Sequence, residues 1–135
     1  MTGLVYKELP IEDITYRNRV EFLNGEEQKF YDALLKSMAA YGMRDPIFIA
    51  QLHDGTLKTT VGNNRMVIAK ELGMKKIPSM IKLLNPNNND IQGTPLNNEQ
   101  EIIDLFYSKK GLEIKKQDGV IWEVMPKNPQ KYGKI

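Results

Sequence analysis

One segment near the middle of the chain limits the fold more than any other, because it combines strand, turn, helix and strand signals in a single short stretch. Residues 61–81 read VGNNRMVIAKELGMKKIPSMI. An apolar strand end leads into Gly62, and the polar residues that follow lead directly into a short helix that Gly73 ends. A second strand starts at Ile77. This order of elements predicts a mixed α/β domain.

The turn at residues 62–65 has the features of an anion-binding site. The first N–H groups of a helix have no partner within the helix, and the positive end of the helix dipole lies beside them. Arg65 adds a forked guanidinium, which suits phosphate oxygens. We therefore expect a phosphorylated ligand, most plausibly a nucleotide, to bind at Gly62, Asn63, Asn64, Arg65 and Met66.

The same residues also have purely structural interpretations. Gly62 can simply permit a tight turn between strand and helix. Either asparagine after it can cap the helix, and we expect one of the two to be a cap and the other a ligand contact. Arg65 can pair with Asp45 or Glu71 instead of a phosphate.

Other basic residues are candidates for the same site or for nucleic acid. Arg44 and Gly42 lie in the loop before the strand that is expected to pair with the strand ending at the turn. Arg17 and Arg19 form a second basic loop, which either faces phosphate or is exposed. His53 lies in a predicted turn and is expected on the surface. Trp122 follows an alternating apolar pattern and is expected in the core.

Strand and helix patterns alternate along the rest of the chain. Strands are expected at Val5–Leu9, Pro46–Ala50, Leu57–Val61, Ile77–Leu84, Leu112–Lys116 and Val120–Val124. Helices are expected from Asn24 to Tyr41, from Met66 to Leu72, and from a cap at Asn97 or Asn98 to Phe106 or Tyr107, with a loop at Asn85–Pro95. Asp54-Gly55 and Asp118-Gly119 are expected to make hairpin turns. We predict a single α/β (α+β) domain over residues 1–126, with a small mixed sheet and flanking helices, and a flexible tail at 127–135.

Composition excludes several classes of protein. The 135 residues contain no cysteine, which rules out disulfide scaffolds, cysteine-ligated zinc and thiol nucleophiles. The net charge of +2 is too small to mark a nucleic-acid binder by itself. The opening residues contain no long apolar run, so no signal peptide or membrane span is expected and the default location is cytoplasmic.

Charge is nevertheless concentrated at one end of the chain. Residues 109–135 contain seven lysines and three acidic residues. Lys109 and Lys110, with Arg17 and Arg19, are therefore candidate nucleic-acid contacts, and Lys115 and Lys116 extend that group. A solvated basic tail is the simpler interpretation of the same pattern.

The order of these motifs resembles the N-terminal domain of ParB partition proteins and, more widely, the ParB/sulfiredoxin superfamily. Four stretches carry the resemblance: KELPIEDI, LLKSMAAYGMRDPIFI, HDGTLKTTVGNNR and MVIAKELGMKKIPSMI. They correspond to an opening strand, a helix with its glycine end and a Pro-Ile strand, a hairpin leading to a Gly-x-x-Arg box, and an alanine-bearing helix followed by an Ile-Pro strand. Together they cover somewhat more than half of the chain.

Members of the superfamily have different activities, and the residues of this chain match the requirements of these activities unequally. In ParB proteins the box has the form Gly-Glu-Arg-Arg and binds CTP, and here Gly62 and Arg65 match its outer positions while Asn63 and Asn64 replace the two inner ones. Sulfiredoxins carry a catalytic cysteine in the box, so that activity is excluded. Related serine kinases use a carboxylate base, and relatives called ParB-like nucleases would need a metal cluster that the sequence does not mark. ParB proteins also carry a helix-turn-helix reader, which residues 85–135 are too few and too strand-like to form.

Three functions therefore stay open. The first is a nucleotide-binding domain, using CTP or ATP with or without Mg²⁺, that works as a nucleotide-dependent switch. The second is a phosphoryl-transfer enzyme or ParB-like nuclease acting on DNA. The third is a DNA-associated accessory protein of a phage or mobile element, with a steep salt dependence of binding. Each of these functions is compatible with a homodimer, and no membrane partner is expected.

Overall fold

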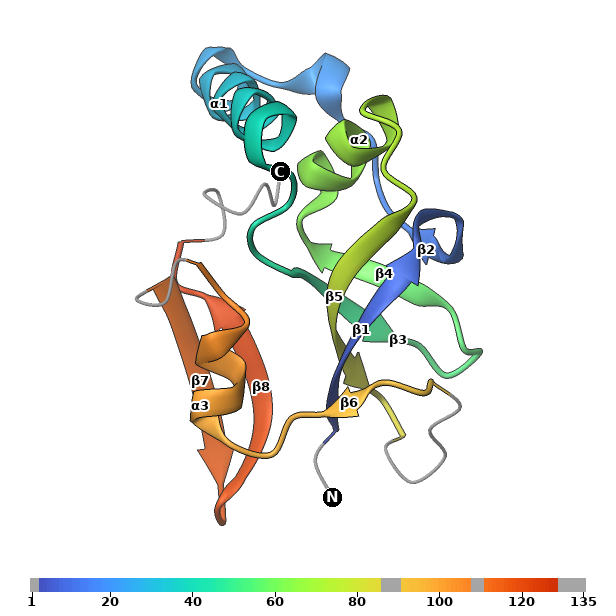
Figure 1. Ribbon diagram of the computed structural model, residues 1–135, viewed down its shortest axis with the longest axis vertical. Helices are drawn as coiled ribbons and strands as arrows, with labels where there is room; N and C mark the ends of the chain where they lie inside the picture. Colours follow the sequence, from blue (N-terminus) through green and yellow to red (C-terminus); the bar gives the residue numbers. More distant parts are fainter. Residues whose placement is uncertain (1–2, 86–90, 108–110, 129–135) are drawn as a thin grey trace.

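A six-stranded mixed sheet lies at the centre of the computed structural model, which describes residues 3–85, 91–107 and 111–128 (Figure 1). Its strands are β1 (Leu4–Pro10), β2 (Ile14–Thr15), β3 (Ile47–Gln51), β4 (Leu57–Val61), β5 (Lys76–Leu83) and β6 (Thr94–Pro95). They lie in the order β2-β4-β3-β5-β1-β6. The β3–β5 and β2–β4 pairs are parallel and the other pairs are antiparallel, which confirms the expected mixed sheet.

Helices and a second, two-stranded sheet surround this central sheet. The helices are α1 (Gly25–Tyr41), α2 (Asn63–Glu71) and α3 (Glu99–Asp104), with short 3₁₀ turns at Ile11–Asp13 and Val20–Phe22. Strands β7 (Leu112–Gln117) and β8 (Val120–Pro126) form an antiparallel hairpin. In Figure 1, α1 and α2 lie together at one end of the molecule, whereas α3 lies beside the hairpin. The α+β class is thus confirmed.

The first helix starts and ends where the sequence predicts. The Asn24 side chain accepts hydrogen bonds from the N–H groups of Glu26 and Glu27, at 3.1 and 2.9 Å, and the Glu27 carboxylate accepts the Asn24 N–H at 3.0 Å. This reciprocal capping box satisfies N–H groups that a helix start leaves free. Gly42 ends α1 with a φ of 73°. Tyr41, expected on the buried stripe, is instead exposed.

Two apolar cores lie on opposite faces of the central sheet. Because consecutive side chains of a strand point to opposite faces, Ile47 and Ile49 of β3 pack with α1 and α2, and Phe48 points the other way. The Phe48 ring stacks on Phe106 at a centroid distance of 5.5 Å. The helices α1 and α2 therefore cover one face of the sheet, and α3 with the β7–β8 hairpin covers the other.

Besides shifts of one or two residues at strand ends, three differences from the predicted elements concern α2, α3 and β6. Helix α2 starts at Asn63 instead of Met66, because Gly62 supplies the non-helical residue before it. Helix α3 is capped by Asn98 as expected but ends at Asp104. Strand β6 lies within the expected loop, where Tyr6 pairs with Thr94 along the edge of β1.

Both predicted hairpin turns are confirmed. The turn between β3 and β4 contains Gly55 with a φ of 88°, and the turn between β7 and β8 contains Asp118 and Gly119 with φ values of 52° and 78°. In the second turn, positive φ at two successive residues matches the twist of the paired strands; in the first, only the glycine has positive φ.

Trp122 is not in the core, so that expectation is wrong. The side chain is 44% exposed, on β8. The register of the hairpin shifts between Lys115 and Lys116, and this irregularity breaks the alternation from which burial was inferred. Ile121 and Val124 are buried on either side of it.

Gly62 has a conformation and surroundings that favour glycine. Its φ is 116°, a value that other residues rarely adopt. A Cβ added there would lie 2.9 Å from Cγ2 of Ile47 and 3.3 Å from Nη2 of Arg65. The end of β4 therefore comes close to the start of β3, and a larger residue would push the two apart.

Replacing Gly62 should cost more stability than replacing Gly73 or Gly25. We expect Gly62→Ala to lower the free energy of unfolding by about 2–4 kcal/mol, through backbone strain and the contact with Ile47. Gly73→Ala, with a φ of 75° but nothing within 4 Å of the new Cβ, should lose only the strain component. Gly25→Ala, which has neither feature, should be close to neutral in urea unfolding measurements. Equal losses at Gly62 and Gly73 would contradict the close approach.

Candidate functional site

The N-terminus of α2 carries no side-chain cap. Gly62 is the N-cap residue, and the first hydrogen bond of the helix runs from the Met66 N–H to the Gly62 carbonyl at 3.0 Å. The expectation that Asn63 or Asn64 caps the helix is therefore wrong, because both lie inside its first turn. The N–H groups of residues 63–65 take no part in the helical hydrogen-bond ladder.

The predicted box is buried. Asn63 and Asn64 are each 2% exposed and Arg65 is 4% exposed. The Asn63 side-chain oxygen accepts a hydrogen bond from the Arg17 N–H at 2.9 Å. The basic loop that contains Arg17 and Arg19 therefore lies over the start of α2, while both arginines are exposed. The structure thus brings the two predicted basic segments together.

Asn64 has a buried acceptor that the described structure does not satisfy. Its side-chain oxygen has no hydrogen-bond partner. Leaving such a group unpaired costs about 1–3 kcal/mol, so native proteins rarely do so without compensation. A hydrogen-bond donor that reaches the first turn of α2 would remove this cost.

Arg65 is held by backbone carbonyls. Its Nη1 donates to the Asp45 carbonyl at 2.6 Å, and its Nη2 donates to the Pro46 carbonyl at 3.2 Å. Of the two structural partners weighed for Arg65, Asp45 is thus in contact with it, through its main-chain carbonyl. Direct contact of this guanidinium with phosphate stays a prediction.

The loop before β3 connects this site to the C-terminal part of the chain. The Asp45 carboxylate accepts a hydrogen bond from the Tyr107 N–H at 2.6 Å. The guanidinium carbon of Arg44 lies 4.0 Å from the ring centroid of Tyr41 and 4.4 Å from that of Tyr107, at cation–π distances. Arg44 is thus near the turn but faces two aromatic rings. The role of Tyr107 has no local sequence signal, because its partners are distant in the sequence.

The other predicted site residues fall into two groups. Met66 is fully buried and its N–H is already bonded to the Gly62 carbonyl, and Gly42 is the residue that ends α1. Lys109 and Lys110 lie outside the described residues.

A metal-binding cluster, which a nuclease would need, and a membrane-spanning helix are two further features that bear on function. Within the described ranges, no group of three or more His, Cys, Asp or Glu side chains is arranged to hold a metal ion. No helix in this part of the chain is long and apolar enough to cross a membrane.

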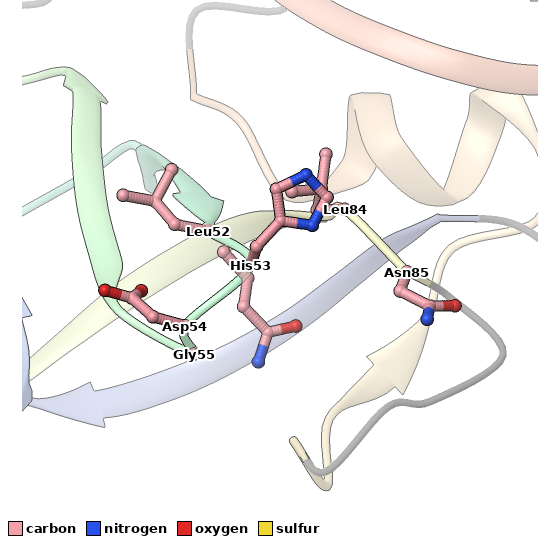
Figure 2. Close-up of a pocket in the computed structure, with 7 residues that line it drawn as sticks. Leu52, His53, Asp54, Gly55, Leu84 and Asn85 are labelled. Atoms are coloured by element: carbon pink, nitrogen blue, oxygen red, sulfur yellow. The ribbon is translucent and has the colours of Figure 1, made fainter.

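A cavity of about 250 Å³ lies at the far end of β3 and β4 from Gly62. Figure 2 shows His53 and Asp54 of the hairpin turn on one side and Leu84 and Asn85, after β5, on the other. His53 is exposed, as predicted. The hydrogen bonds that Asp54 accepts from Thr56 lower the pKa of its carboxyl group, so this carboxylate acts mainly within the turn.

The sequence of residues 2–93 matches the ParB N-terminal domain, over more than half of the chain. The chain belongs to this family. The matched range contains the central sheet up to β5, the helices α1 and α2, and the Gly62 turn. It ends before β6, so α3 and the β7–β8 hairpin follow the matched domain.

Individual relatives match only parts of the chain. The nucleoid occlusion protein of Bacillus cereus strain B4264 is 32% identical over 82 residues, which are 58% of this chain and 27% of that protein. The chain therefore spans about a quarter of this relative's length. A truncated ParB from Caulobacter crescentus, complexed with CTP-γ-S, is 24% identical with a TM-score of 0.46, covering 68% of this chain and 56% of that one. Sulfiredoxin from Arabidopsis thaliana is 27% identical with a TM-score of 0.41, and the match covers 58% of this chain and 82% of that one.

Removing the Arg65 side chain should destabilise the fold even without any ligand. Arg65→Ala leaves two carbonyls of the 45–46 loop without their donors, and we expect the free energy of unfolding to fall by about 1.5–3 kcal/mol. Lys70→Ala is the matched control, because Lys70 lies on the same helix but is exposed. Chemical denaturation measures both variants. Equal stability of the two would show that the carbonyl contacts contribute little.

Proposed function

We propose that this protein binds a nucleotide at the N-terminus of α2. The observation that carries the proposal is a buried, uncapped helix start next to an unsatisfied buried side-chain oxygen on Asn64. Phosphate oxygens would accept from the N–H groups of Asn63 and Asn64, where the helix dipole also favours negative charge. A nucleotide also brings hydrogen-bond donors, namely ribose hydroxyls and base amino groups, that could satisfy the Asn64 oxygen. An inorganic phosphate ion at neutral pH has fewer donors.

Positive charge for the phosphates comes from the basic loop in this proposal. The two inner positions of the ParB-type box are uncharged here, at Asn63 and Asn64. Arg17 and Arg19 are exposed, and the Arg17 backbone already contacts Asn63. In this proposal they replace the cation that the box lacks. Arg65 has a structural role, because it donates to the Asp45 and Pro46 carbonyls.

Binding would require the basic loop to move. The loop is bonded to the start of α2 through the Arg17 N–H, which donates to the Asn63 side chain. A nucleotide that displaced this contact would exchange one neutral hydrogen bond for several charge-assisted ones, which are individually stronger. The loop would then exist in a closed form without ligand and a rearranged form with it, as a nucleotide-dependent switch requires.

Calorimetry provides the direct test of nucleotide binding. CTP, ATP and GTP should each be titrated with and without Mg²⁺, and we expect at least one to bind. Replacing both Arg17 and Arg19 with alanine should weaken binding about tenfold or more, the scale of a lost charge-assisted hydrogen bond. Lys36→Ala, which removes an exposed charge on α1, should leave the affinity unchanged. Absence of binding by all three nucleotides at millimolar concentration would reject the proposal.

The two asparagines provide a second test, which separates binding from stability. Asn64→Leu removes an unsatisfied oxygen, so we expect its thermal stability to equal or exceed that of the natural protein while nucleotide affinity falls. Asn63→Leu breaks the hydrogen bond from Arg17 and should lower the stability by about 1 kcal/mol. Melting curves and calorimetry on both variants distinguish these outcomes. If Asn64→Leu binds nucleotide normally, the unsatisfied oxygen is not part of the site.

A further inference from the structure

The exposed tryptophan on β8 lies at an irregularity of the hairpin. Lys115 is opposite Glu123, and Lys116 is opposite Ile121, so Trp122 between them has no cross-strand partner. Such a bulge redirects a side chain away from the regular alternation of the strand. The ring of Trp122 is 44% exposed, while Ile121 and Val124 on the same strand are buried, so one apolar aromatic surface is open to solvent beside the core.

Two lysines flank this ring. The Lys82 and Lys115 ammonium groups lie 5.4 and 5.5 Å from the centroid of Trp122. Glu123 bridges the same two ammonium groups at 3.5 and 3.2 Å. The hydrogen bond from Lys115 lowers the pKa of Glu123, so this carboxylate is ionised at neutral pH. The cluster therefore carries a net positive charge beside an aromatic surface.

A cavity of about 240 Å³ adjoins the cluster, between the central sheet and β8. Lys82 and Glu123 line it together with apolar side chains from the sheet, among them Phe48 and Met80, and with Thr60. Engineered apolar cavities of about 150 Å³ hold benzene, so a planar ring fits the available space. The lysine that faces Trp122 thus also borders a cavity large enough for a base.

We propose that Trp122, Lys82 and Lys115 form a binding site for single-stranded nucleic acid. One base stacks on Trp122, its neighbouring phosphates contact the two lysines, and an adjacent base enters the cavity beside Thr60 and Glu123. The lysine side chains are flexible and about half exposed, so their ammonium groups can turn from the ring to phosphates. Aromatic stacking combined with cations is how proteins bind single strands with little sequence preference.

The geometry favours this ligand over two others. A duplex hides the faces of its bases, so it could use the lysines but not Trp122. An acidic peptide could also use the lysines, but it would gain nothing from a planar aromatic surface next to a ring-sized cavity. The site is on the opposite face of the sheet from α2 and does not depend on the proposed nucleotide site.

The chain offers a direct probe, because Trp122 is its only tryptophan. Oligothymidylate and oligouridylate of roughly twelve nucleotides, within the site sizes of single-strand-binding folds, should be titrated into the protein at low salt. We expect quenching of the Trp122 fluorescence, which saturates with the strand and is reversed by added salt. A duplex of the same length should quench much less.

Variants then assign the contacts. Labelled single strand, followed by fluorescence anisotropy, should bind Trp122→Ala and the Lys82→Gln, Lys115→Gln double variant about tenfold or more weakly. Lys36→Gln is the control for loss of one charge at a distant exposed position, and it should bind nearly as the natural protein does. Circular dichroism establishes whether each variant is folded. Trp122→Phe, which keeps a stacking ring, should retain most of the affinity and thereby separates stacking from a disturbed hairpin.

Several results would overturn this assignment. No quenching by either single strand would do so, as would equal quenching by the duplex. Equal affinity of Trp122→Ala and the natural protein for labelled strand would place any binding elsewhere. CTP bound at α2 should not quench the Trp122 fluorescence. The Asn64→Leu variant should still bind the single strand. The two results separate failure of the nucleotide proposal from failure of the single-strand proposal.

Discussion

The guanidinium of Arg65 connects the parts on which the candidate nucleotide site depends. By donating to the Asp45 and Pro46 carbonyls, it fixes the loop that precedes β3 against the first turn of α2. The same loop contacts the segment after α3, where the Tyr107 N–H donates to the Asp45 carboxylate. A buried charge is stable only when its donors are satisfied, so these carbonyls and the arginine require one another. The start of α2, the loop and the C-terminal elements therefore form one connected unit.

Helix α2 is largely buried although its sequence is not apolar. Seven of its nine residues are buried, and three of these seven are the polar or charged side chains of Asn63, Asn64 and Arg65. Solvent therefore competes little for the first N–H groups of the helix, so any anion that reached them would interact in a medium of lower polarity than water. A ligand at the proposed site would have to displace the basic loop, because the Arg17 N–H is bonded to the Asn63 side chain.

Features set by neighbouring residues could be predicted from the sequence, whereas features set by distant contacts could not. The start of α1 at Asn24 and the Asp54-Gly55 turn depend on local backbone geometry, and both were expected. The direction of the Arg65 side chain depends on carbonyls about twenty residues earlier in the chain, and the tyrosine pair around Arg44 joins α1 to the segment that follows α3. Trp122 was misplaced because a single shift of register reverses which side chains face the core.

The stacked rings of Phe48 and Phe106 have a consequence for where this domain can be divided. Phe48 lies within the range that matches the ParB N-terminal domain, and Phe106 lies after its end at residue 93. The face of the sheet that carries Phe48 is apolar, and α3 and the hairpin shield it from water. A fragment cut at the family boundary would expose this face and be prone to self-association. The elements after the matched domain therefore have two roles, because α3 and the β7–β8 hairpin shield this face of the sheet and β8 also carries the exposed Trp122.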